Sequence, residues 1–245
     1  MKYECCLADA GGTLFNFLAG EKNALRETLA AHGLPYDENI AALYSRINLG
    51  HWKRLEQGLT TQKRLRVERF ADFLAALREG GMDMPPIEPE QMALTFVDGL
   101  ARQSIPMEGA LAFVKAVSAH MPVVLVTNGI SRVQHGRFDH CELKPYLKGL
   151  VISEELGVSK PDPAMIDAGM REAGVTDKRR VVMLGDSLTA DIAAANNAGV
   201  DSILFTDGAE PPEGHAATYA ARTLAEAARI VLSQNGCLLG KNSVQ

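Results

Sequence analysis

The sequence predicts an α/β protein in which a four-helix-bundle cap domain is inserted into a Rossmann-like core with a parallel sheet. Beyond residue 108, short apolar runs typical of buried strands alternate with amphipathic helical segments. One more apolar run, residues 3–8, stands near the N-terminus, and a long stretch with only helical periodicity separates it from the others. Because one strand precedes the helical stretch, we expect core residues 1–15 and 108–245 to enclose cap residues 16–107.

Turn-forming residues divide the helical stretch, at residues 33–35, at Gly58 and at residues 80–89, which predicts about four helices. In the core we expect strands and helices to alternate after the first strand. The expected strands are residues 3–8, 122–127, 149–153, 180–184 and 201–205, and the expected helices are residues 108–120, 131–141, 163–173, 189–198 and 224–232.

Composition excludes several classes of protein. The 245 residues are 47% hydrophobic and 22% charged, which is typical of a folded domain, and the formal net charge of -5 provides no positive field for nucleic acid. The sequence has no apolar segment long enough to span a bilayer. Its four cysteines show no C-x-x-C spacing, which favours buried thiols in a reducing compartment: Cys5, Cys6, Cys141 and Cys237. We therefore expect a cytoplasmic monomer or homodimer that binds neither nucleic acid nor membrane.

Polar residues follow four of the expected strands. Because ligands bind beyond the carboxyl ends of parallel strands, near a switch in strand order, these residues should meet at one edge of the sheet. They are Asp9 and Thr13 after the first strand, Thr127 and Asn128 after the second, Ser159 and Lys160 after the third, and Asp186 and Asp191 after the fourth.

Four motifs at these positions resemble those of the haloacid dehalogenase superfamily and occur in the same order. They read D-A-G-G-T-L-F from Asp9, V-T-N-G from Val126, S-K-P-D from Ser159 and G-D-S-L-T-A-D from Gly185. The resemblance extends over essentially the whole chain, and the helical stretch lies where this superfamily has its four-helix cap. In the cap, N-x-x-x-W-x-x-x-E-x-G from Asn48, with Arg69 downstream, resembles the pyrimidine 5'-nucleotidase branch.

The chemistry of these residues agrees with the phosphatase activity that the resemblance implies. A carboxylate can attack phosphorus and form an aspartyl-phosphate, and Asp9 is the expected nucleophile. Mg²⁺ prefers oxygen ligands, and Asp9, the Gly11 carbonyl and Asp186 would supply them. Asp191 would orient Asp186 or a metal-bound water.

A second set of groups would bind the phosphoryl group of a small phosphorylated metabolite. The Thr127 hydroxyl would donate to it, and Lys160 would offset charge on Asp9 and on the transferring oxygens. Backbone amides of residues 10–12, including Ala10 and Gly11, and of Asn128 would complete the anion site.

One position departs from the pattern of the phosphatases that the chain resembles. Their first motif reads D-x-D, and its second Asp is a general acid and base; here that position is Gly11. Without it, hydrolysis of an alkyl phosphomonoester should lose about 10²–10⁴-fold in rate. Three interpretations stay open: a phosphatase that obtains its proton elsewhere, a phosphate-binding protein of low turnover, and a hydrolase of C–P or C–halogen bonds.

The cap should select the substrate, because Asp9 and Lys160 would contact only its phosphate. Asn48, Trp52 and Arg69 are the expected contacts with the leaving group, for example a nucleoside. A C–P hydrolase would need a Schiff-base lysine in the cap, for which Lys53 and Lys63 are the candidates.

Overall fold

The chain consists of two compact units. The computed structural model describes residues 1–233. Among the described residues, the first unit, here called the α/β unit, contains residues 1–16, 106–129 and 140–233. The second, here called the helical unit, contains residues 17–105 and 130–139.

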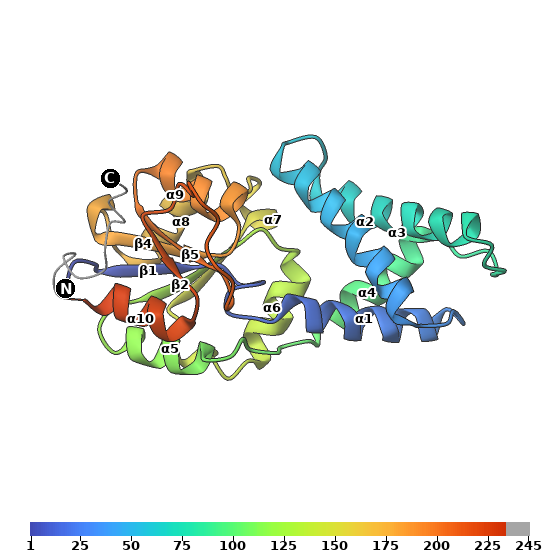
Figure 1. Ribbon diagram of the computed structural model, residues 1–245, viewed down its shortest axis with the longest axis horizontal. Coiled ribbons are helices and arrows are strands. Elements are labelled where there is room, and N and C mark those ends of the chain that lie inside the picture. Colours follow the sequence, from blue (N-terminus) through green and yellow to red (C-terminus); the bar gives the residue numbers. More distant parts are fainter. Residues whose placement is uncertain (234–245) are drawn as a thin grey trace. The chain divides into compact units, whose positions relative to one another are not determined.

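The α/β unit is built on a six-stranded sheet, which confirms the predicted Rossmann-like architecture (Figure 1). The strands are β1 (Cys5–Ala8), β2 (Val123–Thr127), β3 (Gly149–Ile152), β4 (Val181–Gly185), β5 (Asp201–Phe205) and β6 (Tyr219–Ala221). They pair in the order β3-β2-β1-β4-β5-β6, and every pairing is parallel. Strand β1 is therefore central and β4 lies beside it, so the strand order switches direction at this pair.

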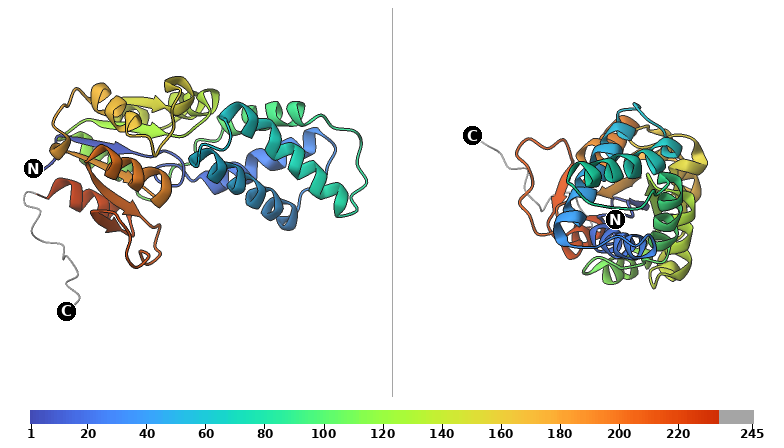
Figure 2. Two further views of the ribbon diagram at one scale, coloured as in Figure 1. Left: turned by 90° about the horizontal axis from the view of Figure 1, so that it is seen from above. Right: turned by 90° about the vertical axis from the view of Figure 1, so that its right-hand side faces the viewer.

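Helices cover both faces of the sheet, as a parallel sheet with buried faces requires. Helices α5 (Ala110–Ser118) and α10 (Leu224–Leu232) pack together on one face, and α8 (Ala164–Ala173) and α9 (Ala193–Ala198) lie on the other (Figures 1 and 2). On the second face, side chains of the central strands pack against both helices in an apolar cluster. Its buried members include Leu7, Val124, Met165, Met183 and Ala194.

The helical unit contains the four expected helices and one more. The four are α1 (Phe17–Ala31), α2 (Glu38–Glu56), α3 (Gln62–Glu79) and α4 (Pro89–Ala101). Asp37 and Thr61 cap α2 and α3 by accepting hydrogen bonds from Ile40 N and Arg64 N. Fully buried aromatic rings hold the bundle together: Tyr44 stands with its centroid 5.2–5.3 Å from those of Phe70, Phe73 and Phe96.

The fifth helix of this unit is α6 (Ser131–His140), which the sequence placed in the core. It belongs with the bundle because Ile130 and Val133 pack in the bundle's apolar cluster. The Arg137 Nε donates to the Gln103 carbonyl at 3.1 Å. A Cβ at Gly136 would stand 2.7 Å from the Ala101 carbonyl oxygen, so only glycine allows this close approach to the end of α4.

Most expected elements of the α/β unit are confirmed to within a few residues, and three details differ. The helix expected at 189–198 is divided into a π-helical turn, η3 (Leu188–Ile192), followed by α9. The strand β6 was not predicted, because three residues carry too little periodicity. A short helix, α7 (Ser153–Leu156), follows β3, and single 3-10 turns stand at η1 (Lys144–Tyr146) and η2 (Lys178–Arg180).

Candidate active site

Asp9 stands directly after the central strand β1, where its carboxylate is 10% exposed. Its amide donates to the Leu184 carbonyl at 2.8 Å, which continues the pairing of β1 with β4 by one residue. The chain then turns tightly, because the Ala10 carbonyl accepts from the amides of Leu14 and Phe15. The two neighbouring strands thus fix the position of Asp9, and its side chain stands at the switch in strand order.

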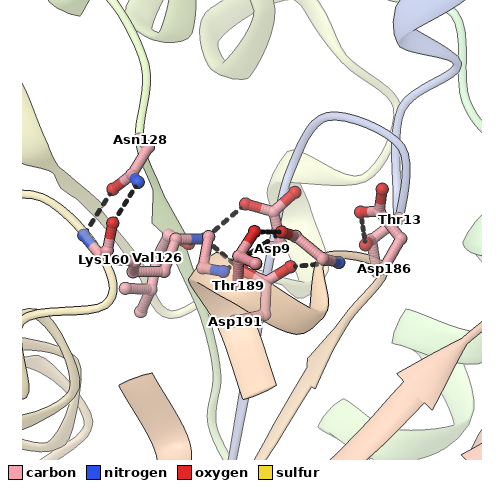
Figure 3. Close-up of polar contacts among 10 residues, drawn as sticks. Asp9, Thr13, Val126, Asn128, Lys160, Asp186, Thr189 and Asp191 are labelled. Atoms are coloured by element: carbon pink, nitrogen blue, oxygen red, sulfur yellow. Dashed lines mark hydrogen bonds and ion pairs between the residues drawn. The ribbon is translucent and has the colours of Figure 1, made fainter. Parts of the chain in front are cut away.

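Lys160 connects Asp9 to the third and fourth motifs (Figure 3). Its ammonium is 1% exposed and donates to Asp9 Oδ1 at 2.5 Å, to Asp191 Oδ1 at 2.6 Å and to the Val126 carbonyl at 2.6 Å. Burial alone would lower the pKa of Lys160, but the charges of Asp191 and Asp9 outweigh it and raise that pKa. The lysine is therefore a fixed cation whose three donors are all used.

The end of β2 is fastened to the backbone of Lys160. The Asn128 amide group donates to the Lys160 carbonyl at 2.8 Å, and its Oδ1 accepts from the Lys160 amide at 2.7 Å (Figure 3). Thr127, one residue earlier, is buried at the end of β2. This pair of bonds brings the second and third motifs together without using the ammonium of Lys160.

The two acidic residues after β4 are held by different partners. The Thr13 hydroxyl donates to Asp186 Oδ1 at 2.8 Å, and Asp191 Oδ2 accepts from the Ser187 amide at 3.0 Å. Two glycines make room for these side chains. A Cβ at Gly12 would stand 2.6 Å from Asp186 Oδ2, and one at Gly185 would stand 2.3 Å from the Asp191 carboxylate.

The charges of this site do not balance. Asp9, Asp186 and Asp191 have carboxylate oxygens within 4.8 Å of one another, whereas one ammonium lies among them. Burial, followed by the charges of Asp191 and Asp186, raises the pKa of Asp9 to about 7 despite Lys160. Burial and Asp191 raise the pKa of Asp186 to about 6. Two uncompensated negative charges on an all-oxygen donor set fit a hard divalent cation such as Mg²⁺.

The structure thus brings Asp9, Lys160, Asp186 and Asp191 into one cluster, with Thr127 at the end of the adjacent strand. One expectation is wrong: the Gly12 amide is not available to an anion, because it donates to the Phe15 carbonyl at 2.9 Å. The Val126 carbonyl also accepts from Lys160, a contact that was not predicted from the sequence. Backbone acceptors leave no signal in a sequence, whereas Thr13 as a partner of Asp186 is visible in the first motif.

The expected cap residues lie in the helical unit. Asn48 and Arg69 are 2% and 1% exposed and contact each other, with Arg69 Nη1 donating to Asn48 Oδ1 at 2.9 Å. Trp52 is half-buried one turn after Asn48 on α2. Lys53 and Lys63 are exposed, so neither has the desolvated environment that favours a Schiff-base lysine.

The cysteines take no part in this site. Cys5, Cys6 and Cys141 are buried free thiols, as expected, and Cys237 lies outside the described residues. Burial raises the pKa of Cys5 to about 12. Among residues 1–233, no helix is long and apolar enough to cross a membrane.

A parallel sheet with a carboxylate-lined site at its switch point, interrupted after the first strand by a helical unit, is the architecture of a Rossmann-like α/β protein with an inserted helical domain. The family described as haloacid dehalogenase-like hydrolase matches residues 3–199. The chain belongs to this family, and it is a hydrolase, as the motifs predicted.

Three relatives resemble the chain over most of its length. Pyrimidine 5'-nucleotidase YjjG of Escherichia coli (strain K12) is 30% identical over 92% of this chain and 96% of its own length. Pyrimidine 5'-nucleotidase PynA of Streptococcus pneumoniae is 31% identical over 84% of both chains. The solved structure of the HAD-hydrolase YfnB from Bacillus subtilis superposes with a TM-score of 0.85 at 26% identity, and covers 95% of this chain and 100% of that one.

Proposed function

We propose that this protein is a Mg²⁺-dependent phosphatase that hydrolyses a small phosphomonoester, a nucleoside 5'-monophosphate, through an aspartyl-phosphate on Asp9. The observation that carries the proposal is the charge of the cluster around Lys160: three carboxylates and one ammonium favour a divalent cation, which would allow a phosphate to approach. The protein would act in the cytoplasm as a monomer or homodimer, without nucleic acid or membrane.

Asp9 and Asp186, with the Gly11 carbonyl, would hold Mg²⁺, which supplies positive charge for the carboxylates and the substrate phosphate. Asp191 is engaged by Lys160 and by the Ser187 amide, so it suits a supporting role. The structure of YfnB, reported above, was solved with bound magnesium. The donor set and the relative together support Mg²⁺ as the cofactor.

In the first step, an Asp9 oxygen attacks phosphorus while the bond to the leaving alkoxide breaks. Lys160 holds the Asp9 carboxylate through Oδ1, which keeps its other oxygen free to attack. The Thr127 hydroxyl and the amides of Ala10, Gly11 and Asn128 would bind the phosphoryl oxygens. Water then cleaves the acyl-phosphate and releases phosphate, and Asp9 is regenerated.

The leaving alkoxide must receive a proton, and Gly11 has none to donate. Among the described residues of the α/β cluster, Lys160 already uses its three donors and Thr13 is bonded to Asp186. We propose that water, or a group of the helical unit, supplies this proton. Turnover should consequently be slower than in a chain with Asp at position 11.

The substrate class is supported by the names of two relatives, which are pyrimidine 5'-nucleotidases. Asn48, Trp52 and Arg69 would contact the nucleoside, because they are the polar and aromatic residues of the helical unit that the motif singles out. The exposure of Lys53 and Lys63 gives no support to a C–P hydrolase. A haloacid hydrolase would have no use for the Mg²⁺ site.

A second candidate function rests on Gly11 itself. With the acid/base position empty and the Asp9–Lys160 cluster intact, the chain would bind phosphate without useful turnover. Such a protein would act as a sensor or interaction partner.

The test is phosphate release from UMP and dUMP with Mg²⁺ or with EDTA, by this chain and by its Gly11→Asp variant. The phosphatase proposal expects Mg²⁺-dependent release by the parent chain, and a faster rate for Gly11→Asp. Asp9→Asn is the matched control and should release nothing. If only Gly11→Asp is active, phosphate binding without turnover is the function instead. Release that is equal in EDTA would contradict the Mg²⁺ site.

A further inference from the structure

The helical unit contains a second polar cluster, which shares no residue with the carboxylate cluster. It is formed by Glu21 on α1, Ser45 and Asn48 on α2 and Arg69 on α3. Glu21, Asn48 and Arg69 are each no more than 2% exposed. Glu21 lies in the second turn of α1, so the cluster is at the end of the bundle where the chain enters the helical unit.

The acidic member of this cluster is fully engaged. One oxygen of Glu21 accepts from the Ser45 hydroxyl, and the other accepts from the Asn48 amide. Burial raises the pKa of Glu21 above its ordinary value, and the two hydrogen bonds and the charge of Arg69 oppose that shift. Each carboxylate oxygen of Glu21 thus already accepts one hydrogen bond within the bundle.

Arg69, in contrast, is only partly engaged. Its Nη1 donates to Asn48 Oδ1 at 2.9 Å, and the guanidinium carbon stands 4.9 Å from the ring centroid of Phe96 and 5.3 Å from that of Phe70. Its Nε and Nη2 are buried and have no partner. These two atoms form one edge of the guanidinium, a pair of parallel donors suited to bidentate recognition.

Three more polar atoms on α2 are buried without a partner: Tyr44 Oη, His51 Nδ1 and Trp52 Nε1. Ser45, Asn48 and Trp52 are spaced by three and four residues, so they share one face of α2. Leaving a buried donor unpaired costs free energy, and the cost is larger for a charged donor. The cluster is therefore short of acceptors, chiefly at the free edge of Arg69.

The charge of the cluster restricts what can supply those acceptors. Glu21 and Arg69 balance each other, so a buried phosphate or carboxylate would add an uncompensated negative charge. A neutral carbonyl oxygen satisfies the donors without that cost. All pyrimidine bases carry a carbonyl at position 2. Among the purines adenine has no carbonyl and guanine carries one at position 6, so the pyrimidine choice rests on the proposed substrate class.

We propose that the free edge of Arg69 binds the 2-carbonyl oxygen of a pyrimidine base, with Trp52 contributing its indole N–H or ring, and that Arg69 thereby determines base specificity. This inference rests on the proposed nucleotide substrate and adds the atom by which the base is recognised. Asn48 also positions the guanidinium, because its Oδ1 accepts from Arg69 Nη1, and Glu21 positions Asn48 by accepting from its amide group.

The experiment measures binding of free nucleosides to the full chain by calorimetry. Nucleosides carry no phosphate, so the result does not depend on hydrolysis or on Mg²⁺. Uridine and cytidine should bind, and adenosine should not. Replacing one oxygen of the ligand by sulfur, a weaker acceptor, should weaken binding about tenfold in 2-thiouridine and little in 4-thiouridine.

The matching protein variant is Arg69→Lys, which keeps the charge and removes the paired donors. It should weaken uridine binding about 10- to 100-fold. Arg64→Lys is the control, because Arg64 lies on the same helix and forms an exposed pair with Glu68. For hydrolysis, Arg69→Lys should raise the KM for UMP and leave that for a small ester such as p-nitrophenyl phosphate unchanged.

Three results would overturn the inference: equal affinity for uridine and 2-thiouridine, equal affinity of Arg69→Lys and Arg64→Lys, or a crystal structure with saturating uridine in which water alone meets Arg69. The comparison of thio-nucleosides uses the unaltered chain, so it decides the matter even if Arg69→Lys fails to fold. In each case phosphate release from a small ester still tests the proposed phosphatase separately.

Discussion

The two polar clusters of this protein are unsatisfied in opposite ways. Around Lys160 every donor has an acceptor, yet the charges do not balance, because three carboxylates surround one ammonium. Around Arg69 the charges balance, yet two donors have no acceptor. A cation can offset the excess negative charge around Lys160. A neutral hydrogen-bond acceptor can satisfy the two unpaired donors of Arg69. Comparing the two kinds of imbalance thus separates a metal site from a recognition site.

The largest expected effect is the loss of catalytic activity in the Asp9→Asn variant. The amide cannot act as a nucleophile, so Mg²⁺-dependent phosphate release should fall by about 10⁴-fold or more. The same variant removes one buried negative charge, so the metal-free chain should become more stable in urea. If Asp9→Asn keeps its activity, Asp9 is not the nucleophile. If Asp9→Asn is less stable than the parent chain without metal, the cluster does not carry an excess of negative charge.

Replacing Lys160, the only cation among the described residues of the α/β cluster, should be the most destabilising single change in that cluster. Lys160→Met leaves Asp9 and Asp191 buried without their partner, and we expect a loss of about 3–5 kcal/mol in the free energy of unfolding. Urea unfolding of the metal-free protein measures it. The exposed pair of Lys22 with Glu38 provides a control, since Lys22→Met should cost less than about 1 kcal/mol.

In the helical cluster the corresponding change is Glu21→Gln, which leaves Arg69 without its balancing charge. The amide also turns one acceptor into a donor facing Ser45 or Asn48. We expect a loss of about 1–3 kcal/mol, smaller than for Lys160→Met because Asn48 still engages the guanidinium. If Glu21→Gln lost more free energy of unfolding than Lys160→Met, the expected difference between the two clusters would be contradicted. Glu38→Gln, on the exposed surface of α2, is the matched control.

The smallest effect is a pH dependence that belongs to the α/β cluster alone. The raised pKa values of Asp9, about 7, and Asp186, about 6, mean that protons compete with Mg²⁺ for the site. Mg²⁺ affinity measured by calorimetry should fall at least about tenfold from pH 8 to pH 5.5.

The sign for folding stability follows from the same shifts. Because the pKa values are raised in the folded state, their contribution to stability is complete below about pH 4 and is lost as the pH rises towards 7. Added Mg²⁺ should therefore raise the Tm more at pH 8 than at pH 5.5. A constant Tm shift would show that the two carboxylates are not the ligands.

The order of elements and the α/β cluster could be anticipated from the sequence for a definite physical reason. Asp9 and Asp186 directly follow apolar strands and Thr127 ends one, and parallel strands bring their carboxyl ends to one edge. Lys160 follows a strand less closely, and its motif identified it. Local periodicity, which locates the strand ends, was therefore enough to predict most of the α/β cluster.

The contacts of the helical cluster could not be anticipated to the same degree. The motif named Asn48 and Arg69, but Glu21 and Ser45 lie on helical faces where a polar residue is as easily explained by solvent. The grouping of α6 was also missed, because it depends on close packing at Gly136 and on a bond from Arg137 to a backbone carbonyl. Neither leaves a periodic signal.

The membership of α6 in the helical unit has a consequence for exchanging parts between relatives. The helical unit is made from two stretches of the chain, residues 17–105 and 130–139, so the polypeptide passes between the units four times. A chimera that transplants only the first stretch would lack Ile130 and Val133, which pack in the apolar cluster of the transplanted bundle. A working graft must carry both stretches. The second stretch has its junctions beside Gly129 and His140, and the first of these two directly follows Thr127 and Asn128.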